Sequence, residues 1–445
     1  MMMRHLFAAV AVLWAGSASA QIDVQSVTSP EGIEAWLVES HEIPFVAVEV
    51  LFRGGASLDA PGKRGAANLM TALIEEGSGD MDAQEFQTAR QSLAAEFSFG
   101  AFDDAMRVSA KFLTENRDEA VELLNGALTD PRFDESAIER VREQVLANIR
   151  SSERDPTDIA ATRFDEDAFG DHPYGSDYNG TAESVQALTR DDLIQSHADI
   201  LARDRIYVGV VGDITPEELG PMLDDLFEGL PETGGEMPTA VDPDIEPGIE
   251  VIDYPSPQSV VYFGQQGMER DDPDYFAAYL LNEILGGSGR QSRLMEEVRE
   301  KRGLTYGISS FLVNYDHADL FLGYFNSAND KVAEAIDVAQ SEWARLAEEG
   351  VTEEELETAK TYVTGAYPLR FDGNGRIADI LVGMQFTDLP IDYIETRNDR
   401  MNAVTLEDIN RVASELLTPD ALHFVVVGQP EGLEDDATVE GEQTQ

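Results

Sequence analysis

One segment of the C-terminal half combines two residue types that could stabilise negative charge on a carbonyl oxygen. Arg299 and Tyr306 lie seven residues apart within residues 292–307. A guanidinium fork and a phenol hydroxyl are hydrogen-bond donors, and peptide hydrolysis places negative charge on the former carbonyl oxygen. A structural role also fits, because Arg299 has acidic neighbours at Glu296 and Glu300 and Tyr306 could be a half-buried strand residue. The two residue types at this spacing leave both interpretations open.

A second segment, residues 65–77, has the spacing of a half-buried helix. Its apolar residues recur three and four positions apart, at Ala66, Leu69, Met70, Leu73 and Ile74. Gly77 predicts the end of this helix. Between the apolar positions, Asn68, Thr71 and Ala72 carry a neutral amide, a hydroxyl and a methyl group. None of these groups suits a catalytic zinc ion, which needs three imidazole, thiolate or carboxylate ligands.

Other residue types that can take part in catalysis do not form a local catalytic set. The histidines beyond residue 20 are separated in sequence: His41, His172, His197, His317 and His423. We expect each of them to be satisfied or exposed rather than a metal ligand. There is no G-x-S-x-G motif, and the adjacent Glu75 and Glu76 point apart on the predicted helix. The glycine-rich run 286–289 lacks the ending of a phosphate-binding loop and is interpreted as a turn.

The two segments together resemble the pitrilysin-type (M16) zinc peptidases. Residues 65–77 resemble the first-helix segment of that family, and residues 286–307 are similar to a family segment at nearly every step. In the family the first helix carries an H-x-x-E-H motif, whose histidines bind zinc and whose Glu activates water. The matching positions here are Asn68, Thr71 and Ala72, and the position of the third ligand, a Glu, is Asn148. The resemblance therefore implies that this chain binds no catalytic zinc.

The resemblance also implies a role for the retained residues. In the family an Arg and a Tyr seven residues apart face the zinc site, and they match Arg299 and Tyr306. Some members divide the labour between two chains, of which one holds zinc and the other supplies the Arg/Tyr pair. The resemblance implies a zinc-less subunit of a heterodimeric metallopeptidase that acts on peptides or unfolded polypeptide, with zinc in the partner. It further implies that the strand with Gly100, Ala101 and Phe102 is a sheet edge able to accept peptide.

Two other functions remain open. A non-enzymatic peptide-binding or scaffold protein on a retired peptidase fold would need neither Arg299 nor Tyr306. A lone hydrolase would need a rebuilt metal site. Copurification of a zinc-bearing partner and the metal content of the chain would discriminate among these functions.

The chain repeats one plan at an offset of about 216 residues. Residues 188–193 lead into the apolar run 206–212, and residues 404–409 lead into the run 422–428. Each pair is typical of a capped helix followed by a buried strand. The mixture of strand and helix signals in each half indicates an α+β fold. The resemblance implies two homologous α/β-roll domains that are joined by a linker and enclose a cavity.

Composition suggests where the signal peptide, the two domains, the linker and the tail begin and end. Residues 1–20 have the charged start, short apolar run and A-x-A ending of a secretory signal peptide. We expect domains at 21–229 and 249–430, an extended linker rich in Pro, Gly and acidic residues at 230–248, and a disordered acidic tail at 431–445.

The net charge and the cysteine content limit which cellular compartment and which partners are expected for this chain. The signal-like start predicts export to a periplasm, and no later apolar run reaches the roughly 18 residues of a membrane span. The chain has no cysteine, so burial of a core must stabilise it without disulfides. Its net charge of −55 argues against nucleic acid or an anionic membrane as a partner.

Overall fold

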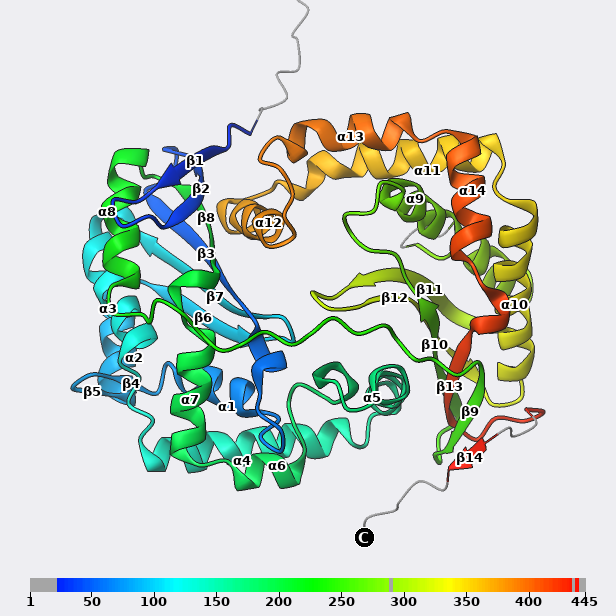
Figure 1. Cartoon of the computed structure of the whole chain (residues 1–445), viewed down its shortest axis with the longest axis horizontal. Coiled ribbons are helices and arrows are strands. Elements are labelled where there is room, and N and C mark those ends of the chain that lie inside the picture. Colours follow the sequence, from blue (N-terminus) through cyan, green and yellow to red (C-terminus); the bar gives the residue numbers. More distant parts are fainter. Residues whose placement is uncertain (1–21, 288–290, 434–436, 440–445) are drawn as a thin grey trace, which may run out of the picture.

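The computed structural model describes residues 22–287, 291–433 and 437–439. Two six-stranded sheets lie in opposite halves of the molecule (Figure 1). The first sheet has the order β1 (Gln25–Thr28), β2 (Glu34–Glu39), β8 (Ile206–Gly212), β3 (Phe45–Arg53), β7 (Ala105–Leu113) and β6 (Glu96–Ala101). The second has the order β11 (Thr305–Asn314), β12 (Asp319–Ala328), β10 (Gln258–Gln266), β13 (His423–Gly428), β9 (Gly248–Asp253) and β14 (Ala437–Val439).

Five strands of each sheet share one topology, and the sixth strands differ, since β1 is antiparallel to β2 whereas β14 is parallel to β9. In the first, β3 lies antiparallel between β7 and β8, and β8 pairs in parallel with β2. In the second, β10 lies antiparallel between β12 and β13, and β13 pairs in parallel with β9. The outermost antiparallel strands, β6 and β11, are likewise equivalent. The α+β class and the duplicated plan expected from the sequence are confirmed.

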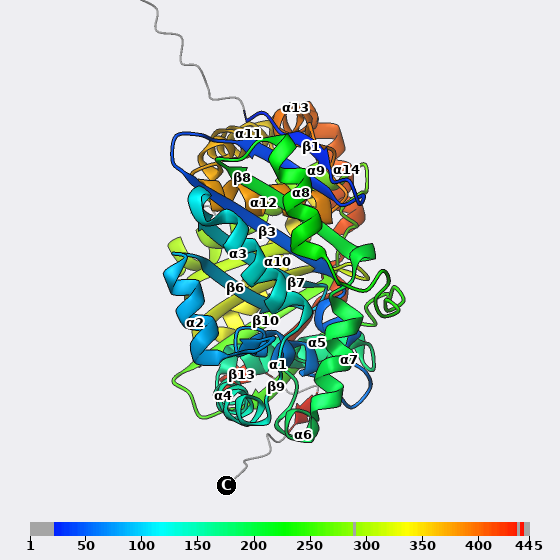
Figure 2. The same ribbon diagram turned by 90° about the vertical axis from the view of Figure 1, so that its left-hand side faces the viewer.

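Helices of the first half cover the outer face of its sheet, as Figure 2 shows for α3 and α8. Buried apolar side chains of these helices and of the strands form one continuous core. The helices of this half are α1 (Ala66–Leu73), α2 (Ala83–Ser92), α3 (Arg117–Thr129), α4 (Glu135–Ser152), α5 (Pro156–Phe169), α6 (Ala182–Ala187), α7 (Arg190–Ile200) and α8 (Pro216–Phe227). The short hairpin of β4 (Gly77–Ser78) and β5 (Met81–Asp82) separates α1 from α2.

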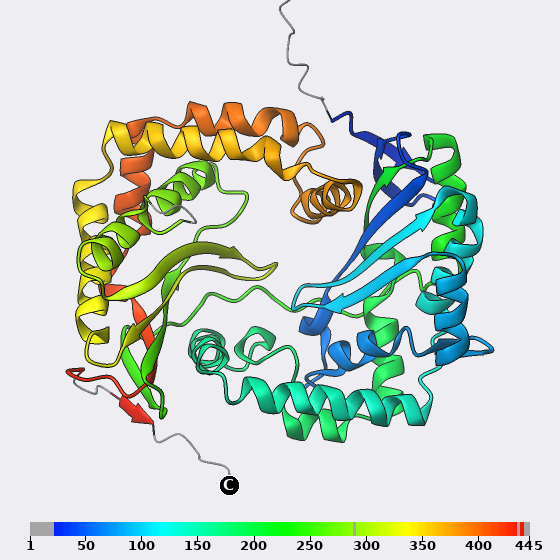
Figure 3. The same cartoon turned by 180° about the vertical axis from the view of Figure 1, so that it is seen from behind.

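The second half repeats this arrangement, with α10 on the outer side of its sheet (Figure 3, yellow). Its buried apolar residues form a second core, which includes the fully buried Trp343. Its helices are α9 (Tyr275–Leu285), the π-helical turn η5 (Met295–Glu300), α10 (Val332–Glu349), α11 (Glu353–Ala366), the 3₁₀ turn η6 (Tyr367–Arg370), α12 (Asn374–Phe386), α13 (Tyr393–Ala403) and α14 (Leu406–Leu416).

Each half also gives one helix to the other half. Helix α5 leaves the first half and packs against β10 and β13, where the ring of Phe164 lies 5.4 Å from that of Tyr262. Helix α12 leaves the second half and packs against β3 and β8, where Ala378 and Leu381 contact Val211. The inner face of each sheet is therefore covered by a helix from the opposite half, and the two halves interlock.

The remaining segments are the expected linker, the expected tail, the signal-like start and the glycine-rich run. Residues 230–247 run without helix or strand, and they are attached to both halves because Gly235 N donates to Asp199 O and Val241 N donates to His317 O. Within the segment expected to be a disordered tail, Ala437–Val439 instead form β14 beside β9. The signal-like residues 1–20 and the glycine-rich positions Ser288 and Gly289 lie outside the described residues. Across the described residues, no helix combines the length and apolar character required to span a bilayer.

Candidate functional site

Helix α1, which carries the altered zinc motif, is anchored by a carboxylate from the preceding loop. Asp59 accepts hydrogen bonds of 2.8 Å from the backbone amides of Gly65 and Ala67. Gly65 caps the helix at a φ of 92°, a left-handed conformation that favours glycine. Burial raises the pKa of Asp59 to about 6, and the amide donors oppose that rise. The start of the helix is thus closely specified.

The four positions that match the zinc ligands and base do not fit a zinc ion. The side-chain amide of Asn68 donates to Asn179 Oδ1 at 3.1 Å. Thr71 is buried and its hydroxyl has no hydrogen-bond partner among the residues that the structure describes, while Ala72 exposes only a methyl group. Asn148 is exposed on α4, which contacts α1. Because none of these side chains is an imidazole, thiolate or carboxylate, the set cannot supply the three ligands of a catalytic zinc.

Within the described part of the chain, metal-binding residue types do gather on other elements. Asp167 of α5, Glu250 of β9 and His423 of β13 place ligand atoms within 4.8 Å of one another. Arg163 pairs with Asp167 at 2.7 Å and with Glu250 at 2.9 Å, and His423 Nε2 lies 3.0 Å from Asp167. Since Arg163 already pairs with both carboxylates, we interpret the group as an ion-pair network that fastens α5 to the second sheet.

Sequence reasoning missed a pair of histidines that the fold brings together. The rings of His172 and His317 have centroids 6.5 Å apart, and Tyr174 lies 4.6 Å from His172. Burial is the main cause that lowers the pKa of each histidine below its ordinary value. Both rings are therefore neutral near pH 7 and belong to an aromatic cluster between the halves. Because the two histidines are far apart in sequence, no local pattern indicated this contact.

The expected peptide-accepting strand is the outermost strand of its sheet. Gly100 and Ala101 end β6, which pairs only with β7 and contacts α1. Phe102 follows in the turn with 48% of its surface exposed, and the guanidinium of Arg107 lies 5.8 Å from the centre of its ring. An edge strand presents unpaired backbone groups to a peptide. The edge position agrees with what the resemblance implied, and its use by a peptide stays a prediction.

Arg299 lies on the π-helical turn η5. The amide of Lys301 donates to the carbonyl of Glu296, five residues earlier, at 2.9 Å, which is the pattern of a π-helix. Such single turns occur often at functional sites. Glu296 pairs with Lys301 at 3.0 Å, so Arg299 keeps only a loose contact, in which its Nε lies 3.6 Å from Glu300. The guanidinium of Arg299 is thus not neutralised by a close ion pair.

Tyr306 is exposed by an irregularity in the edge strand β11. The pairing of β11 with β12 shifts register between Thr305 and Ile308. The hydroxyl of Thr305 stabilises this shift, because it donates to Asn326 O at 2.6 Å and accepts from Gly307 N at 3.1 Å. A bulge re-aims the side chains that it carries, and 85% of Tyr306 is exposed. The alternative of a half-buried strand aromatic is therefore wrong.

The candidate residues form two groups. Arg299 and Tyr306 lie on the contacting elements η5 and β11 of the second half. Asn68 and Asn148 lie on α1 and α4 of the first half, and α1 also contacts β6. Among residues 22–287, 291–433 and 437–439, no hydrogen bond or ion pair joins the two groups. The first group offers a guanidinium and a phenol as hydrogen-bond donors, and the second offers no zinc-ligand chemistry.

Sequence reasoning also missed three arginines that border one cavity. Arg270, Arg370 and Arg397 come from separate segments of the second half. The only local signal was the spacing of Tyr393 and Arg397, four positions apart on one helix face.

Two family models match most of the chain. The model described as insulinase (peptidase family M16) matches residues 35–182, and the model described as peptidase M16 inactive domain matches residues 187–363. The chain belongs to the M16 peptidase family.

Similar proteins extend this assignment over nearly the whole chain. The non-peptidase homolog YmxG of Helicobacter pylori is 25% identical over 391 residues, which cover 87% of this chain and 90% of that protein. The uncharacterized zinc protease YmxG of Bacillus subtilis is 23% identical over 403 residues, 89% and 96% of the two chains. The crystal structure of a peptidase M16 inactive domain from Pseudomonas fluorescens has a TM-score of 0.86 and 28% identity, and covers 94% of this chain and all of that one. The chain is an inactive-type M16 peptidase homologue.

Proposed function

We propose that this chain is the zinc-less subunit of a heterodimeric M16 metallopeptidase of the periplasm. It would complete the active site of a zinc-bearing M16 homologue that hydrolyses peptides or unfolded polypeptide. The loss of all four zinc-motif side chains supports a non-catalytic role for the first half. The signal-peptide composition of residues 1–20 supports export.

The observation that carries this proposal is the exposure of Tyr306. A bulged edge strand presents its ring with 85% of the surface exposed, and its hydroxyl forms no hydrogen bond within the described chain. Solvation of a large aromatic ring has no evident structural benefit here, because buried aromatic area is what stabilises folds. Presentation of a donor to an external group explains the arrangement better.

Arg299 supplies the second donor. Its nearest carboxylate is 3.6 Å away, and the tighter ion pairs around it are formed by Lys301 and Arg302 with Glu297, at 2.7 Å and 2.6 Å. These pairs lower the pKa of Glu297 and fix the turn on which Arg299 stands. The guanidinium can therefore bind a peptide carbonyl or carboxylate without first breaking a strong internal pair.

The chemistry of the complex would be divided between the chains. The partner would hold zinc and the activated water. Tyr306 would donate its hydroxyl to the carbonyl oxygen as negative charge develops on it, and Arg299 would orient the peptide backbone. A peptide strand could add to the edge of β6 near Phe102.

Reconstitution tests the proposal directly. The purified chain is mixed with a zinc-bearing M16 homologue that the same cell exports, and kcat/KM is measured for an internally quenched peptide. Loss of one such donor typically lowers kcat by about 10²–10³-fold. We expect that order of loss for Tyr306→Phe and for Arg299→Ala in the mixed complex, with no change in partner binding.

Two exposed residues outside the site provide matched controls. Tyr362→Phe removes a hydroxyl from a ring that is 49% exposed, and Arg376→Ala removes an exposed guanidinium from α12. Both variants should retain the activity of the complex. If Tyr306→Phe and Arg299→Ala are as active as these controls, the proposed contribution to catalysis is wrong.

A second candidate function is peptide binding without catalysis. The exposed ring of Phe102 beside edge strand β6 favours it. It predicts that the chain alone binds extended peptide with an affinity that Phe102→Ala lowers and Tyr306→Phe leaves unchanged. Isothermal titration with an unfolded polypeptide separates the two functions.

A further inference from the structure

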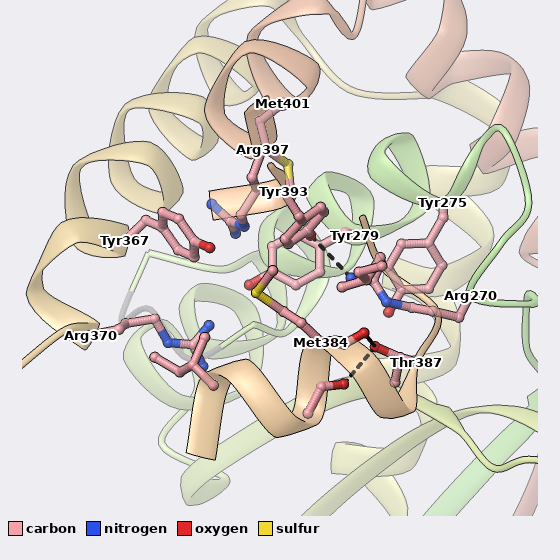
Figure 4. A pocket seen from close by; sticks show the side chains of 13 residues that line it. Arg270, Tyr275, Tyr279, Tyr367, Arg370, Met384, Thr387, Tyr393, Arg397 and Met401 are labelled. Carbon is pink, nitrogen blue, oxygen red and sulfur yellow. Dashed lines mark hydrogen bonds between the residues drawn. The ribbon is translucent and has the colours of Figure 1, made fainter. Parts of the chain in front are cut away.

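A cavity of about 240 Å³ lies in the second half, between α12 and the helices α9 and α13 with the turn η6. Figure 4 shows the side chains of Arg270, Tyr279, Tyr367 and Tyr393 pointing into one space above α12. The cavity belongs neither to the α1 region nor to the segment of Arg299 and Tyr306. Its volume lies below that of most drug-sized sites, so it suits a small ligand or the end of a longer one.

The charge of the lining is opposite to that of the chain. Arg270, Arg370 and Arg397 border the cavity, and no Asp or Glu is among its lining residues. The whole chain has 31 basic residues against 86 acidic ones. Among the described residues, none of the three guanidiniums forms an ion pair with a carboxylate. Arg270 also borders a neighbouring depression with Asp271 and Asp272, but it makes no ion pair there.

Aromatic rings hold two of these guanidiniums in place. Arg270 lies 4.1 Å from the ring centre of Tyr275 and donates to the hydroxyl of Tyr393 at 3.1 Å. Arg397 lies 4.3 Å from the ring centre of Tyr367, is only 4% exposed, and donates to Val363 O at 3.4 Å and to Asn398 Oδ1 at 3.2 Å. A buried guanidinium without a carboxylate is costly unless another group compensates its charge. Ring contacts and these hydrogen bonds to neutral acceptors compensate part of that charge, and a bound anion would add the opposite charge that they lack.

The tyrosine hydroxyls add neutral donors. Burial raises the pKa of Tyr367 to about 12, although Arg397 and Arg370 oppose that rise. Burial likewise raises the pKa of Tyr275, against the effect of Arg270. Both hydroxyls therefore stay protonated near neutral pH. That of Tyr275 already donates to Asn314 Oδ1 at 3.0 Å, whereas that of Tyr367 can donate to an oxyanion.

Much of the remaining wall of the cavity is apolar. It includes the side chains Ile380, Met384, Leu389 and Met401, and the hydroxyl of Thr387, which also borders the cavity, donates to Gly383 O. Methionine side chains adapt to the shape of a ligand and contact aromatic rings favourably. A ligand with both an anionic group and an apolar body would therefore use both parts of the lining.

The position of this cavity in the duplicated fold is also informative. The buried residues of α1 recur on α9 at a constant offset, so that Ala66, Leu69 and Met70 correspond to Ala277, Leu280 and Leu281. The same offset matches Asn68, the first zinc-motif position, with Tyr279 of the cavity. The second half thus has an arginine-rich cavity at the place that is equivalent to the zinc position of the first half.

We propose that this cavity binds a carboxylate with an apolar or aromatic body, through Arg270, Arg370 and Arg397. Planar guanidiniums match a carboxylate in bidentate geometry. A free organic acid and the C-terminal residue of a peptide share this chemistry. The proposal does not depend on the function proposed above, because it concerns the isolated chain.

Calorimetric titration of the full chain tests the proposal with defined probes. 3-Phenylpropionate represents a free acid, N-acetylphenylalanine represents a peptide C-terminus, and the amide of each probe removes the charge. We expect saturable binding of at least one acid and none of its amide. The tighter acid identifies the source of the natural carboxylate, and either result supports the site.

Substitutions locate the binding in the cavity. Arg370 is exposed and forms no ion pair with the described part of the chain, so Arg370→Gln should fold normally and weaken the binding of the acid by about tenfold or more. Arg270→Gln should do the same. Arg376→Gln, on the neighbouring helix α12 but outside the lining, is the matched control and should bind as the unaltered chain does. Failure of both acids to bind, equal binding of acid and amide, binding of inorganic phosphate alone, or unchanged binding in Arg370→Gln and Arg270→Gln would overturn the proposal.

Discussion

The backbone amide of Asp316 donates a hydrogen bond of 3.0 Å to the carboxylate of Asp104, 212 residues earlier in the chain. Asp104 lies in the turn between β6 and β7, and Asp316 lies in the turn between β11 and β12. Tyr174 donates its hydroxyl to the same Asp104, and Arg53 lies 3.5 Å from Asp316. The tips of the two equivalent hairpins therefore meet, and this contact adds to the exchange of α5 and α12 in joining the halves.

Removal of the carboxylate at this junction should destabilise the protein. Asp104→Ala leaves the buried hydroxyl of Tyr174 and the amide of Asp316 without their acceptor, which typically costs about 1–3 kcal/mol. We expect a loss of that size in urea unfolding. Asp171→Ala removes an exposed carboxylate from a nearby loop and is the control. A change for Asp104→Ala no larger than that of the control would show that the contact does not stabilise the junction.

Stability should depend on pH through Asp165 of α5. Burial, followed by the charges of Asp103, Asp177 and Glu166, raises the pKa of Asp165 to about 8 from an ordinary value of 3.8. The folded state thus binds a proton that the unfolded state releases between these values. The contribution of Asp165 to stability is fully present below pH 3.8 and is lost as the pH rises through about 8.

Asp165→Asn isolates this effect because the amide is neutral at every pH. We expect the variant to be more stable than the unaltered chain at pH 9, by at least about 1.4 kcal/mol, the equivalent of one pKa unit. The advantage should shrink as the pH falls toward 5. Parallel melting temperatures across this range measure it, and a difference that stays constant with pH would contradict the assignment.

Close approach of α12 to the first sheet depends on Gly209 of β8. A Cβ atom at this position would lie 2.4 Å from the carbonyl oxygen of Ala378, a backbone atom that cannot move aside cheaply. Gly209→Ala should therefore cost about 1–3 kcal/mol through displacement of α12. Gly375→Ala in α12 itself meets nothing within 4 Å and should be neutral or stabilising by up to about 1 kcal/mol. Equal stability of the two variants in thermal unfolding would show that α12 does not pack closely against β8.

Restoring the lost ligands should restore metal binding without restoring the general base. The triple variant Asn68→His, Ala72→His and Asn148→Glu supplies three zinc ligands on α1 and α4, which already contact each other. We expect about one zinc per chain for this variant and essentially none for the unaltered chain, measured by elemental analysis after dialysis. Stoichiometric zinc in the unaltered chain would instead indicate a rebuilt metal site.

Local sequence features predicted the elements and the family with little ambiguity. The apolar spacing of residues 66–74 predicted α1, because the period of a helix is set by neighbouring residues alone. The repeated pattern before residues 206–212 and 422–428 predicted two similar halves for the same reason. The positions of Asn68, Thr71 and Ala72 could be read directly, since loss of ligand chemistry depends only on residue type.

Tertiary packing alone determined which distant residues meet. One face of α12 packs against the first sheet and another lines the cavity of the second half. The sequence of α12 therefore cannot show which half the helix covers. Arg270 and Arg397 are 127 positions apart, and no local pattern records that they border one cavity. The exposure of Tyr306 depends on pairing with a strand that follows it in the chain. Local periodicity reflects the backbone geometry of one element, whereas burial, ion pairing and edge position follow from contacts between elements that are far apart in sequence.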